Sequence, residues 1–302
     1  MSKKVLLLYG GFSSEKDVSI SAKNDIAEAL KSKNYTVIEH NLTNAWELVE
    51  VLKTEKPDVV YNALHGNWGE DGEIQGFLDL LQIPYTHSNL KTSVIGMDKY
   101  ITKLIATQYG VKTAKGEKLS AAEYAQQGTR INYPHVVKPL CDGSSVGVHI
   151  VKNAKEAKNV KYEDPETKLI VEEYIAGQEL TVMCLEGKTY AVTELRAKNE
   201  FYDFEAKYTK GATEHILPAE IPEDVEKRCK KFAEIMHKTL KCNTLSRSDF
   251  RYNFKDGLVF LEINTNPGMT KLSLVPEQAA YAKIEFADIC QKLVENAKCR
   301  PL

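Results

Sequence analysis

Short apolar runs and amphipathic segments alternate along the first ninety residues of the chain. Apolar runs at 4–9, 35–40, 58–64 and 83–86 predict strands, and the segments 18–30, 46–53 and 74–80 have the spacing of amphipathic helices. Strands separated by helices are typical of an α/β unit with a parallel sheet. We therefore expect an N-terminal Rossmann-like parallel-sheet domain, and we place its end at residue 93, where the pattern changes.

The rest of the chain mixes strands and helices less regularly, which predicts α+β units. Strands are expected at 135–139, 168–175 and 190–195, with helices at 222–240 and within 275–297. We divide this part into a smaller domain at 94–180 and a C-terminal domain at 181–302. The polar and aromatic segment 201–211 has no periodic pattern, so we expect a functional lid and not a bare connection.

Residues 246–273 contain a predicted hairpin. Two apolar-rich runs flank Asp256-Gly257, a pair typical of a two-residue turn. With these residues in the turn, Arg251 lies opposite Glu262 and Asp249 lies opposite Asn264. Opposed side chains share one face of a sheet, and the face alternates with every residue.

This register places candidate metal ligands together. Asp249, Glu262 and Asn264 offer two carboxylates and an amide oxygen on one face, with Arg247 two residues further along it; such hard oxygen ligands suit Mg²⁺. The opposite face can pack in a core through Phe250, Tyr252, Leu261 and Ile263. The alternative is an ordinary half-buried hairpin with a charged outer face, and a slip of one residue would send Asp249 to the other side.

Several loops carry side chains that could bind substrates. Segment 140–148 is rich in small residues that could cover phosphates, with Lys99 and Lys138 adding positive charge. The strand end near residue 175 could present its backbone to an adenine edge, and Glu179 could accept hydrogen bonds from ribose hydroxyls. Glu15 and His65 follow the carboxyl ends of predicted strands, where ligands bind in open α/β sheets. Solvated loops and a plain hairpin turn are the alternatives.

Composition narrows the class of protein. The 302 residues carry 40 basic and 42 acidic side chains, a formal net charge of −2, which gives no reason to expect a nucleic-acid partner. We expect no membrane span, and the N-terminal apolar run is too short for a signal peptide. The six cysteines form no Cys-x-x-Cys pair, so we expect free thiols in a reducing cytoplasm.

Together, the motifs resemble the D-alanine–D-alanine ligases of the ATP-grasp superfamily along nearly the whole chain. Single motifs are weak signals, but seven in the right order are specific. They are Gly10-Gly11-x-Ser13-x-Glu15-x-x-Val18-Ser19, His65-Gly66-x-x-Gly69-Glu70-Asp71-Gly72, Gly96-Met97-Asp98-Lys99, Val137-Lys138-Pro139-x-x-x-Gly143-Ser144-Ser145-Val146-Gly147, the segment 172–179, Tyr202-Asp203-x-Glu205-Ala206-Lys207-Tyr208, and Glu262-Ile263-Asn264-Thr265-x-Pro267-Gly268-Met269-Thr270-x-x-Ser273-Leu274.

The resemblance implies a three-domain ATP-grasp architecture and a reaction for peptidoglycan precursor synthesis. In such enzymes ATP phosphorylates the carboxylate of one D-alanine, and the amine of a second D-alanine attacks the acyl phosphate. Two Mg²⁺ ions, or Mn²⁺ in their place, would neutralise phosphate charge, so that catalysis rests on positioning and electrostatics. The family also implies a cytoplasmic homodimer.

The resemblance assigns roles by matching position. The implied metal ligands are Asp249, Glu262 and Asn264. The implied ATP ligands are Lys99, Lys138, Ser145, Glu172, Glu173, Ile175, Glu179 and Lys207. The implied D-alanine ligands are Glu15, His65, Arg247, Gly268 and Ser273. In the implied catalytic set, Arg247 and the Gly268 backbone stabilise negative charge, Ser273 holds the second carboxylate, and Ser144 and Tyr208 connect the lid to Glu15.

The chain departs from the family pattern at two places. Phe204 replaces a tyrosine of the lid, and a glycine expected near Ala282 is missing, which leaves a local turn in question.

Three alternative functions are considered. A D-alanine–D-lactate or D-serine ligase would use the same chemistry. A non-catalytic ATP-binding module would have lost metal ligands or phosphate lysines, and none is missing. A dinucleotide oxidoreductase is disfavoured because the first turn lacks Gly-x-Gly-x-x-Gly.

Overall fold

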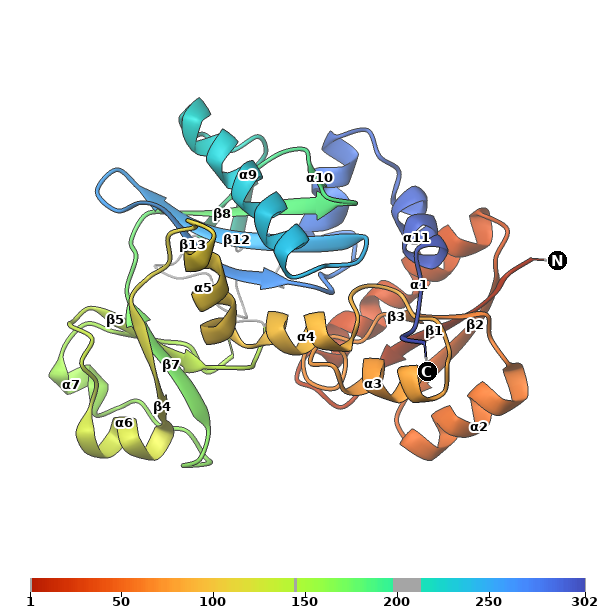
Figure 1. Cartoon of the computed structure of the whole chain (residues 1–302), viewed down its shortest axis with the longest axis horizontal. Coiled ribbons are helices and arrows are strands. Elements are labelled where there is room, and N and C mark those ends of the chain that lie inside the picture. Colours follow the sequence, from red (N-terminus) through yellow and green to blue (C-terminus); the bar gives the residue numbers. More distant parts are fainter. Residues whose placement is uncertain (1, 144–145, 198–212, 302) are drawn as a thin grey trace.

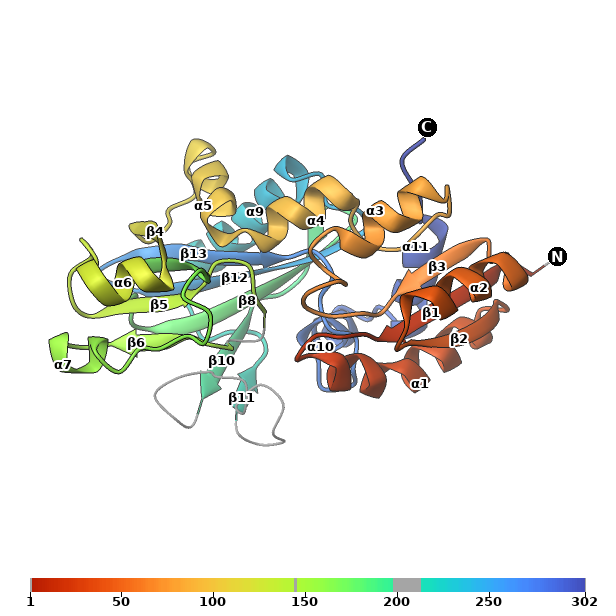
Figure 2. The ribbon, with the colours of Figure 1, turned by 90° about the horizontal axis from the view of Figure 1, so that it is seen from below.

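The computed structural model describes residues 2–143, 146–197 and 213–301, which form three sheets (Figures 1 and 2). A parallel sheet in the order β2-β1-β3 contains β1 (Lys4–Gly10), β2 (Thr36–Leu42) and β3 (Val59–Asn62). An antiparallel sheet in the order β4-β7-β5-β6 contains β4 (Gly116–Ser120), β5 (His135–Pro139), β6 (His149–Val151) and β7 (Lys168–Glu173).

The third sheet is antiparallel and has the order β11-β10-β8-β12-β13, with β9 beside β8. Its strands are β8 (Gln178–Leu185), β9 (Lys188–Thr189), β10 (Thr193–Ala197), β11 (Thr213–Ile216), β12 (Leu245–Asn253) and β13 (Gly257–Asn264). In both views this sheet lies between the parallel sheet and the four-stranded sheet. The combination of a parallel sheet with antiparallel sheets confirms the expected mixed α/β and α+β fold.

The parallel sheet is covered on both faces, which explains why β1 is apolar at successive positions. Val5 and Leu7 point toward a core shared with α1 (Lys16–Ser32) and α11 (Phe286–Glu295). Leu6 and Leu8 point toward a second core formed with α2 (Ala45–Glu55) and α3 (Glu73–Leu80). Alternate side chains of one strand are therefore buried on opposite faces. The predicted strand at 83–86 is reduced to bridges that Tyr85 makes with Val60 and Lys298.

Helices α4 (Leu90–Met97), α5 (Lys99–Gln108) and α9 (Glu223–Thr239) lie on the third sheet. Their apolar side chains, among them Ala106 and Met236, form a core with Phe250 and Phe260. The four-stranded sheet packs against α6 (Ala121–Gln127), and α7 (Ala154–Ala157) follows β6. Helix α5 contacts β13 of the third sheet as well as β4 of the four-stranded sheet, so these contacts do not separate the two units. The domain limits at residues 93 and 180 stay predictions.

The β12–β13 hairpin differs from the predicted register. Asn253 pairs with Gly257, so the turn holds the three residues 254–256 and not Asp256-Gly257 alone; Gly257 has a φ of +70°. The strands then pair Phe250 with Phe260. A β-bulge follows, because Asp249 pairs with Glu262 and skips one residue of β13.

Leu261 is the bulge residue, and it changes which side chains share a face of the hairpin. Beyond it Arg247 pairs with Asn264, so Arg247, Asp249, Glu262 and Asn264 still share one face, as predicted. The prediction that Leu261 packs in the core is wrong, because this side chain is only half-buried and faces the cavity described below without joining the core cluster. The other residues predicted for the core face, Phe250, Tyr252 and Ile263, are buried in it.

The turn after α10 (Leu274–Tyr281) forms without the missing glycine. Lys283 takes a φ of +60°, in the left-handed region that glycine adopts more readily. Phe204 lies outside the described residues. Within the part of the chain that is described, every helix is too short or too polar to cross a membrane.

Candidate active site

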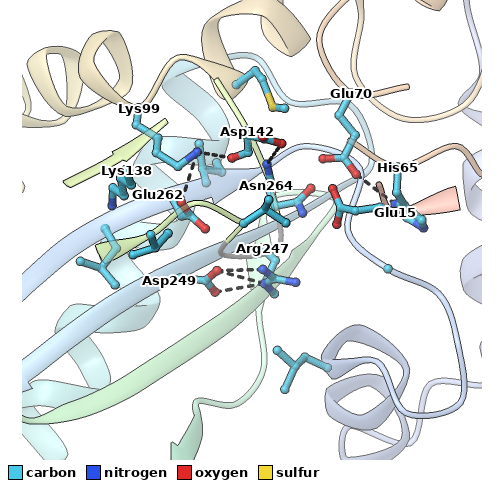
Figure 3. Close-up of a pocket in the computed structure, with 18 of the residues that line it drawn as sticks. Glu15, His65, Glu70, Lys99, Lys138, Asp142, Arg247, Asp249, Glu262 and Asn264 are labelled. Carbon is cyan, nitrogen blue, oxygen red and sulfur yellow. Dashed lines mark hydrogen bonds and ion pairs between the residues drawn. The ribbon is translucent and has the colours of Figure 1, made fainter. Parts of the chain in front are cut away.

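A cavity of about 670 Å³ opens where the three sheets meet. Its wall takes residues from the loops after β1 and β3, from α5, and from the facing strands of both antiparallel sheets. Figure 3 shows Glu15, His65 and Glu70 on one side of the cavity, with Lys99, Lys138 and Glu262 on the other. The lining includes these predicted site residues: Glu15, His65, Lys99, Lys138, Glu172, Glu173, Ile175, Glu179, Arg247, Asp249, Glu262, Asn264, Gly268 and Ser273.

Four predicted site residues lie outside the described residues. They are Ser144, Ser145, Lys207 and Tyr208, and the predicted lid at 201–211 is outside as well. Their roles stay predictions from the resemblance. The described cavity wall therefore holds every other member of the predicted set, which the sequence had spread over positions 15 to 273.

Two acids and an imidazole meet at the N-terminal end of α1. Glu15 occupies the N-cap position of this helix, where a carboxylate is favoured by the helix dipole. The His65 Nδ1 lies 2.9 Å from Glu70 Oε1, and all three side chains are buried. Burial alone would lower the pKa of His65, but the hydrogen bond and charge of Glu70 outweigh it and raise the pKa above its usual value. The two neighbouring acids therefore favour the protonated form of His65.

Two glycines leave room for the Glu15 carboxylate. A Cβ atom on Gly143 would lie 2.4 Å from Glu15 Oε2, and one on Gly66 would lie 2.7 Å from the same oxygen. Gly66 also has a φ of +66°. The Ser13 hydroxyl donates to the His65 carbonyl at 2.6 Å, which ties the first loop to the loop after β3. Glu15 is thus enclosed by three separate segments.

Lys99 reaches the cavity from the first turn of α5. Its Nζ donates to the Asp142 carbonyl at 2.5 Å and lies 3.8 Å from Glu262 Oε2. The side chain is largely buried, so its charge acts over a short range with little screening by water. Burial raises the pKa of the neighbouring Asp142 carboxyl. Lys99 therefore connects the small-residue loop to one predicted metal ligand.

Glu172 lies on β7 between two lysines. Its Oε1 is 2.6 Å from Lys138 Nζ, and its Oε2 is 2.5 Å from Lys103 Nζ. Burial alone would raise the pKa of Glu172, but the two positive charges lower it to about 2. This carboxylate is therefore ionised at neutral pH although it is buried.

The predicted adenosine site lies where the chain passes from one sheet to another. β7 ends at Glu173 and β8 begins at Gln178, so Ile175 lies in the connection and Glu179 near the start of β8. Arg251 of β12 pairs with Glu179, with Nη2 2.7 Å from Oε2, and its Nη1 donates to the Gly177 carbonyl at 3.0 Å. Arg251 thereby fixes both the acid and the backbone before it.

The hairpin face presents the predicted metal ligands to the cavity. Asp249 and Glu262 are directly opposed, and Asn264 follows two residues later. The Asn264 Oδ1 accepts a hydrogen bond from the Asn266 N–H at 2.9 Å, which orients the amide. Two carboxylates and an amide oxygen are donors that would suit a hard cation such as Mg²⁺. In this structure both oxygens of Asp249 are bound by Arg247. The donor set is consistent with the predicted metal.

Arg247 is paired with Asp249 on the same strand. Its Nη2 lies 2.8 Å from Asp249 Oδ2 and its Nε lies 3.0 Å from Oδ1. The Thr181 hydroxyl also donates to Asp249 Oδ1, at 2.6 Å. A planar guanidinium held in this way is a rigid donor to carboxylates and phosphates. Arg247 therefore adds a fixed positive charge at the wall of the cavity.

Gly268 and Ser273 form the part of the wall next to α10. The Ser273 Oγ accepts a hydrogen bond from the Thr270 N–H at 3.0 Å and lies 2.8 Å from the Thr270 hydroxyl. A Cβ atom on Gly268 would lie 3.0 Å from Ser273 Oγ. Ser273 is also the N-cap residue of α10, so backbone N–H groups of the first turn lie close to it.

The sequence did not single out several residues that complete the site. Lys103 follows Lys99 by four residues, a spacing that puts both on one face of a helix. Glu70 belongs to the motif at 65–72, but no role of its own was predicted for it. In the sequence, Arg251 and Thr181 look like ordinary strand residues. Only the pairing of β8 with β12 brings Arg251 to Glu179 and Thr181 to Asp249. The i, i+4 spacing of the two lysines was the one signal available.

Two family models match the chain. One, described as "D-ala D-ala ligase C-terminus", matches residues 104–295, and the other, "D-ala D-ala ligase N-terminus", matches residues 47–88. The D-alanine–D-alanine ligase of Erythrobacter litoralis is 43% identical over 97% of this chain and 93% of the relative. That of Wolbachia pipientis is 41% identical, over 98% and 95%.

Solved structures agree with the sequence relatives. The D-alanine–D-alanine ligase from Bacillus anthracis complexed with ATP has a TM-score of 0.82 and 32% identity, and covers 98% of this chain and 97% of its own. The VanG D-Ala:D-Ser ligase from Enterococcus faecalis has a TM-score of 0.80 and 26% identity, over 98% and 99%. By the family models, by identity over nearly the whole length and by fold, the chain belongs to the D-alanine–D-alanine ligase family.

Proposed function

We infer that this chain joins two D-alanines with ATP, to give D-alanyl-D-alanine for peptidoglycan precursor synthesis. One observation carries the inference: a single cavity holds a carboxylate cluster at one end and buried lysines at the other, in a chain 41–43% identical to ligases of that name. A carboxylate oxygen of the first D-alanine attacks the γ-phosphorus and ADP leaves. The amine nitrogen of the second attacks the acyl carbon, and phosphate and a proton leave.

We propose that ATP lies between the two antiparallel sheets. Glu172, the backbone near Ile175 and Glu179 would hold the adenosine, and Glu173 stands beside them. Lys99 and Lys138 would bind phosphate oxygens, and both are buried so that their charges act through a low dielectric. The ATP bound by the Bacillus anthracis relative supports this use of the cavity. Ser145 and Lys207 are proposed phosphate ligands from the resemblance.

Asp249, Glu262 and Asn264 are the proposed Mg²⁺ ligands. Bound there, Mg²⁺ would neutralise phosphate charge during transfer. The protein contributes the orientation of its own oxygens. The Asn266 N–H donates to the Asn264 amide oxygen and fixes its orientation, and the Thr181 hydroxyl fixes one oxygen of Asp249. Mn²⁺ has the same preference for oxygen ligands and would fit the same set.

The D-alanine sites are proposed at the other end of the cavity. Glu15 would accept the ammonium of the first D-alanine, and His65, which is 2.9 Å from Glu70, would hold the acids of this cluster in place. Arg247 and the Gly268 backbone N–H would stabilise negative charge that develops on the acyl oxygen. Ser273 would bind the carboxylate of the second D-alanine. Ser144 and Tyr208 are proposed to connect the lid to Glu15.

Two alternatives are separated by specific observations. A D-alanine–D-serine ligase is represented among the similar structures, but at 26% identity, below the 41–43% of the D-alanine–D-alanine ligases. A non-catalytic ATP-binding module would not need an acidic face on the hairpin beside Arg247. A cytoplasmic homodimer is proposed from the family alone, and light scattering of the purified protein tests the dimer.

The reaction is tested with purified protein, ATP, Mg²⁺ and single or mixed D-alanine, D-serine, D-lactate and L-alanine. Phosphate release and the mass of the product are measured. We expect phosphate release with D-alanine alone and D-alanyl-D-alanine as the main product in mixtures at pH 7. ATP binding without phosphate release would favour the non-catalytic module. A mainly D-alanyl-D-lactate or D-alanyl-D-serine product would refute the proposed acceptor.

A further inference from the structure

Lys103 is a buried cation that the proposed reaction does not use. Its side chain is 6% exposed, and its Nζ lies 2.5 Å from Glu172 Oε2. It projects from the same face of α5 as Lys99. Lys99, Lys138 and Glu172 line the described part of the cavity, whereas Lys103 is not among its lining residues. It therefore contacts Glu172 from behind the wall of the cavity.

The two oxygens of Glu172 have different partners. Oε2 is bound by Lys103, and Oε1 is bound by Lys138, whose side chain reaches the cavity. The Glu172 side chain is 3% exposed, and a carboxylate buried to this degree without cations would become protonated. Both lysines therefore favour the charged form while the site is free of nucleotide, and each lowers the pKa of Glu172.

Nucleotide binding changes this balance. Lys138 is a proposed phosphate ligand, so in the complex its charge is shared between phosphate and Glu172. Lys103 cannot reach the phosphates from behind the wall and keeps its full interaction with Oε2. A buried carboxylate that loses its cation is strongly destabilised. Lys103 is thus the group that compensates Glu172 in the complex.

We propose that Lys103 is a positioning residue for the nucleotide: it holds Glu172 ionised and oriented as a hydrogen-bond acceptor for the purine amino group, and it leaves Lys138 available to phosphate. The proposal deepens the proposed function, because it rests on the assignment of Glu172 and Lys138 to the ATP site. The added residue, Lys103, would contact neither ATP nor D-alanine.

The proposal predicts a change in the pH dependence of nucleotide binding. Lys103 from α5 and Lys138 from β5 face Glu172 directly. Glu262 of β13 acts on both lysines, and Glu179 of β8 acts on Lys138. Burial lowers the pKa of Lys103, which the charge of Glu172 opposes. In Lys103→Met, Glu172 keeps only Lys138, so the pKa of the buried carboxyl rises. Protonated Glu172 carries a hydrogen on one oxygen, and its affinity for the amino group falls as pH decreases.

The test is calorimetric titration of the full chain with ADP between pH 5.5 and 8. We expect Lys103→Met to raise the Kd of ADP roughly tenfold at pH 7 (about 1.4 kcal/mol), and to make binding weaken toward low pH more steeply than in wild type. Lys103→Arg should restore most of the affinity and remove the extra pH slope. Lys91→Met, the same change at an exposed helical lysine, is the matched control and should bind ADP as wild type does.

Each outcome decides the proposal. If Lys103→Met binds ADP as the control does, or loses affinity by the same factor at every pH, the positioning role is wrong. If Lys103→Met does not fold, Lys103→Met/Glu172→Gln removes the uncompensated carboxylate; it should fold and bind ADP weakly without the extra pH slope, and the same steep slope in it would overturn the proposal. If the wild type failed to ligate D-alanine, the ADP titrations would still show whether Lys103 positions the nucleotide. Failure of the proposed function and failure of this proposal are therefore distinguishable.

Discussion

Replacement of Gly143 by alanine should disable the first substrate site while leaving the fold intact. The added Cβ would lie 2.4 Å from Glu15 Oε2 and 3.2 Å from Glu15 Cδ. Ordinary van der Waals contact begins near 3.4 Å, so the carboxylate must move by 3.4 − 2.4 = 1.0 Å or the loop must retreat by that amount. The clash is with the end of a flexible side chain, which makes it mild for folding.

The direction of the forced movement determines the loss of activity. Gly66 encloses the same Oε2 from another side, so Glu15 has little room to yield. Retreat of the loop instead would disturb the Asp142 carbonyl, which holds Lys99 Nζ at 2.5 Å. A misplacement of about 1 Å in a positioned group lowers the rate by roughly 100-fold. We therefore expect kcat/KM for D-alanine to fall by about two orders of magnitude, with Tm nearly unchanged.

The assay is phosphate release at varied D-alanine, with ADP binding and thermal melting measured on the same variant. Glu15→Asp shortens the side chain and supplies a double-mutant cycle, since a clash with Glu15 requires the two changes to be non-additive. Gly143→Ala with wild-type kcat/KM would refute the reasoning. Additive losses in the cycle would place the effect in the loop and not at Glu15.

Three further changes test other parts of the site. Glu262→Gln should remove most turnover without lowering Tm, and full Mg²⁺-dependent phosphate release in this variant would contradict the metal assignment. Arg251→Met removes a charged hydrogen bond to Glu179 worth about 1.5 kcal/mol and should raise the KM of ATP roughly tenfold; an unchanged KM would count against a ribose role. His65 has a folded-state pKa above its usual 6.5, so its pairing with Glu70 stabilises fully below pH 6.5 and less as pH rises through the folded value. The Tm difference between wild type and Glu70→Gln should therefore be largest at low pH, and a gap that widens with pH would reverse this sign.

The regular elements could be predicted because their burial leaves a periodic trace in the sequence. β1 is apolar throughout because helices cover both faces of its sheet, and α9 is amphipathic because one side faces solvent. Helix α4 was not recognised. Its buried positions are Thr92, Ser93 and Gly96, whereas Val94 is exposed, so burial leaves no apolar stripe along this helix.

The candidate site was partly predictable for a different reason. The residues proposed to bind substrates lie in loops after strands and in short motifs, which can be recognised along the sequence. The residues that support them cannot be read in this way. Lys103 looks like a solvated helical lysine until the fold places Glu172 of β7 beside it, and Arg251 looks like an exposed strand residue until β8 pairs with β12. Long-range pairing, and not local pattern, creates both contacts.

The hairpin shows how residues can share the predicted face although the predicted register is wrong. With the three-residue turn and no bulge, Asp249 would oppose Leu261, and Glu262 would point to the core face with Phe260. The bulge at Leu261 reverses the alternation and returns Glu262 to the face of Asp249. The sequence does contain this signal: Phe260 and Glu262 are two residues apart and would share a face in a regular strand, yet one side chain is apolar and the other is charged. A break of alternation beside candidate metal ligands therefore indicates a bulge that aims the ligands.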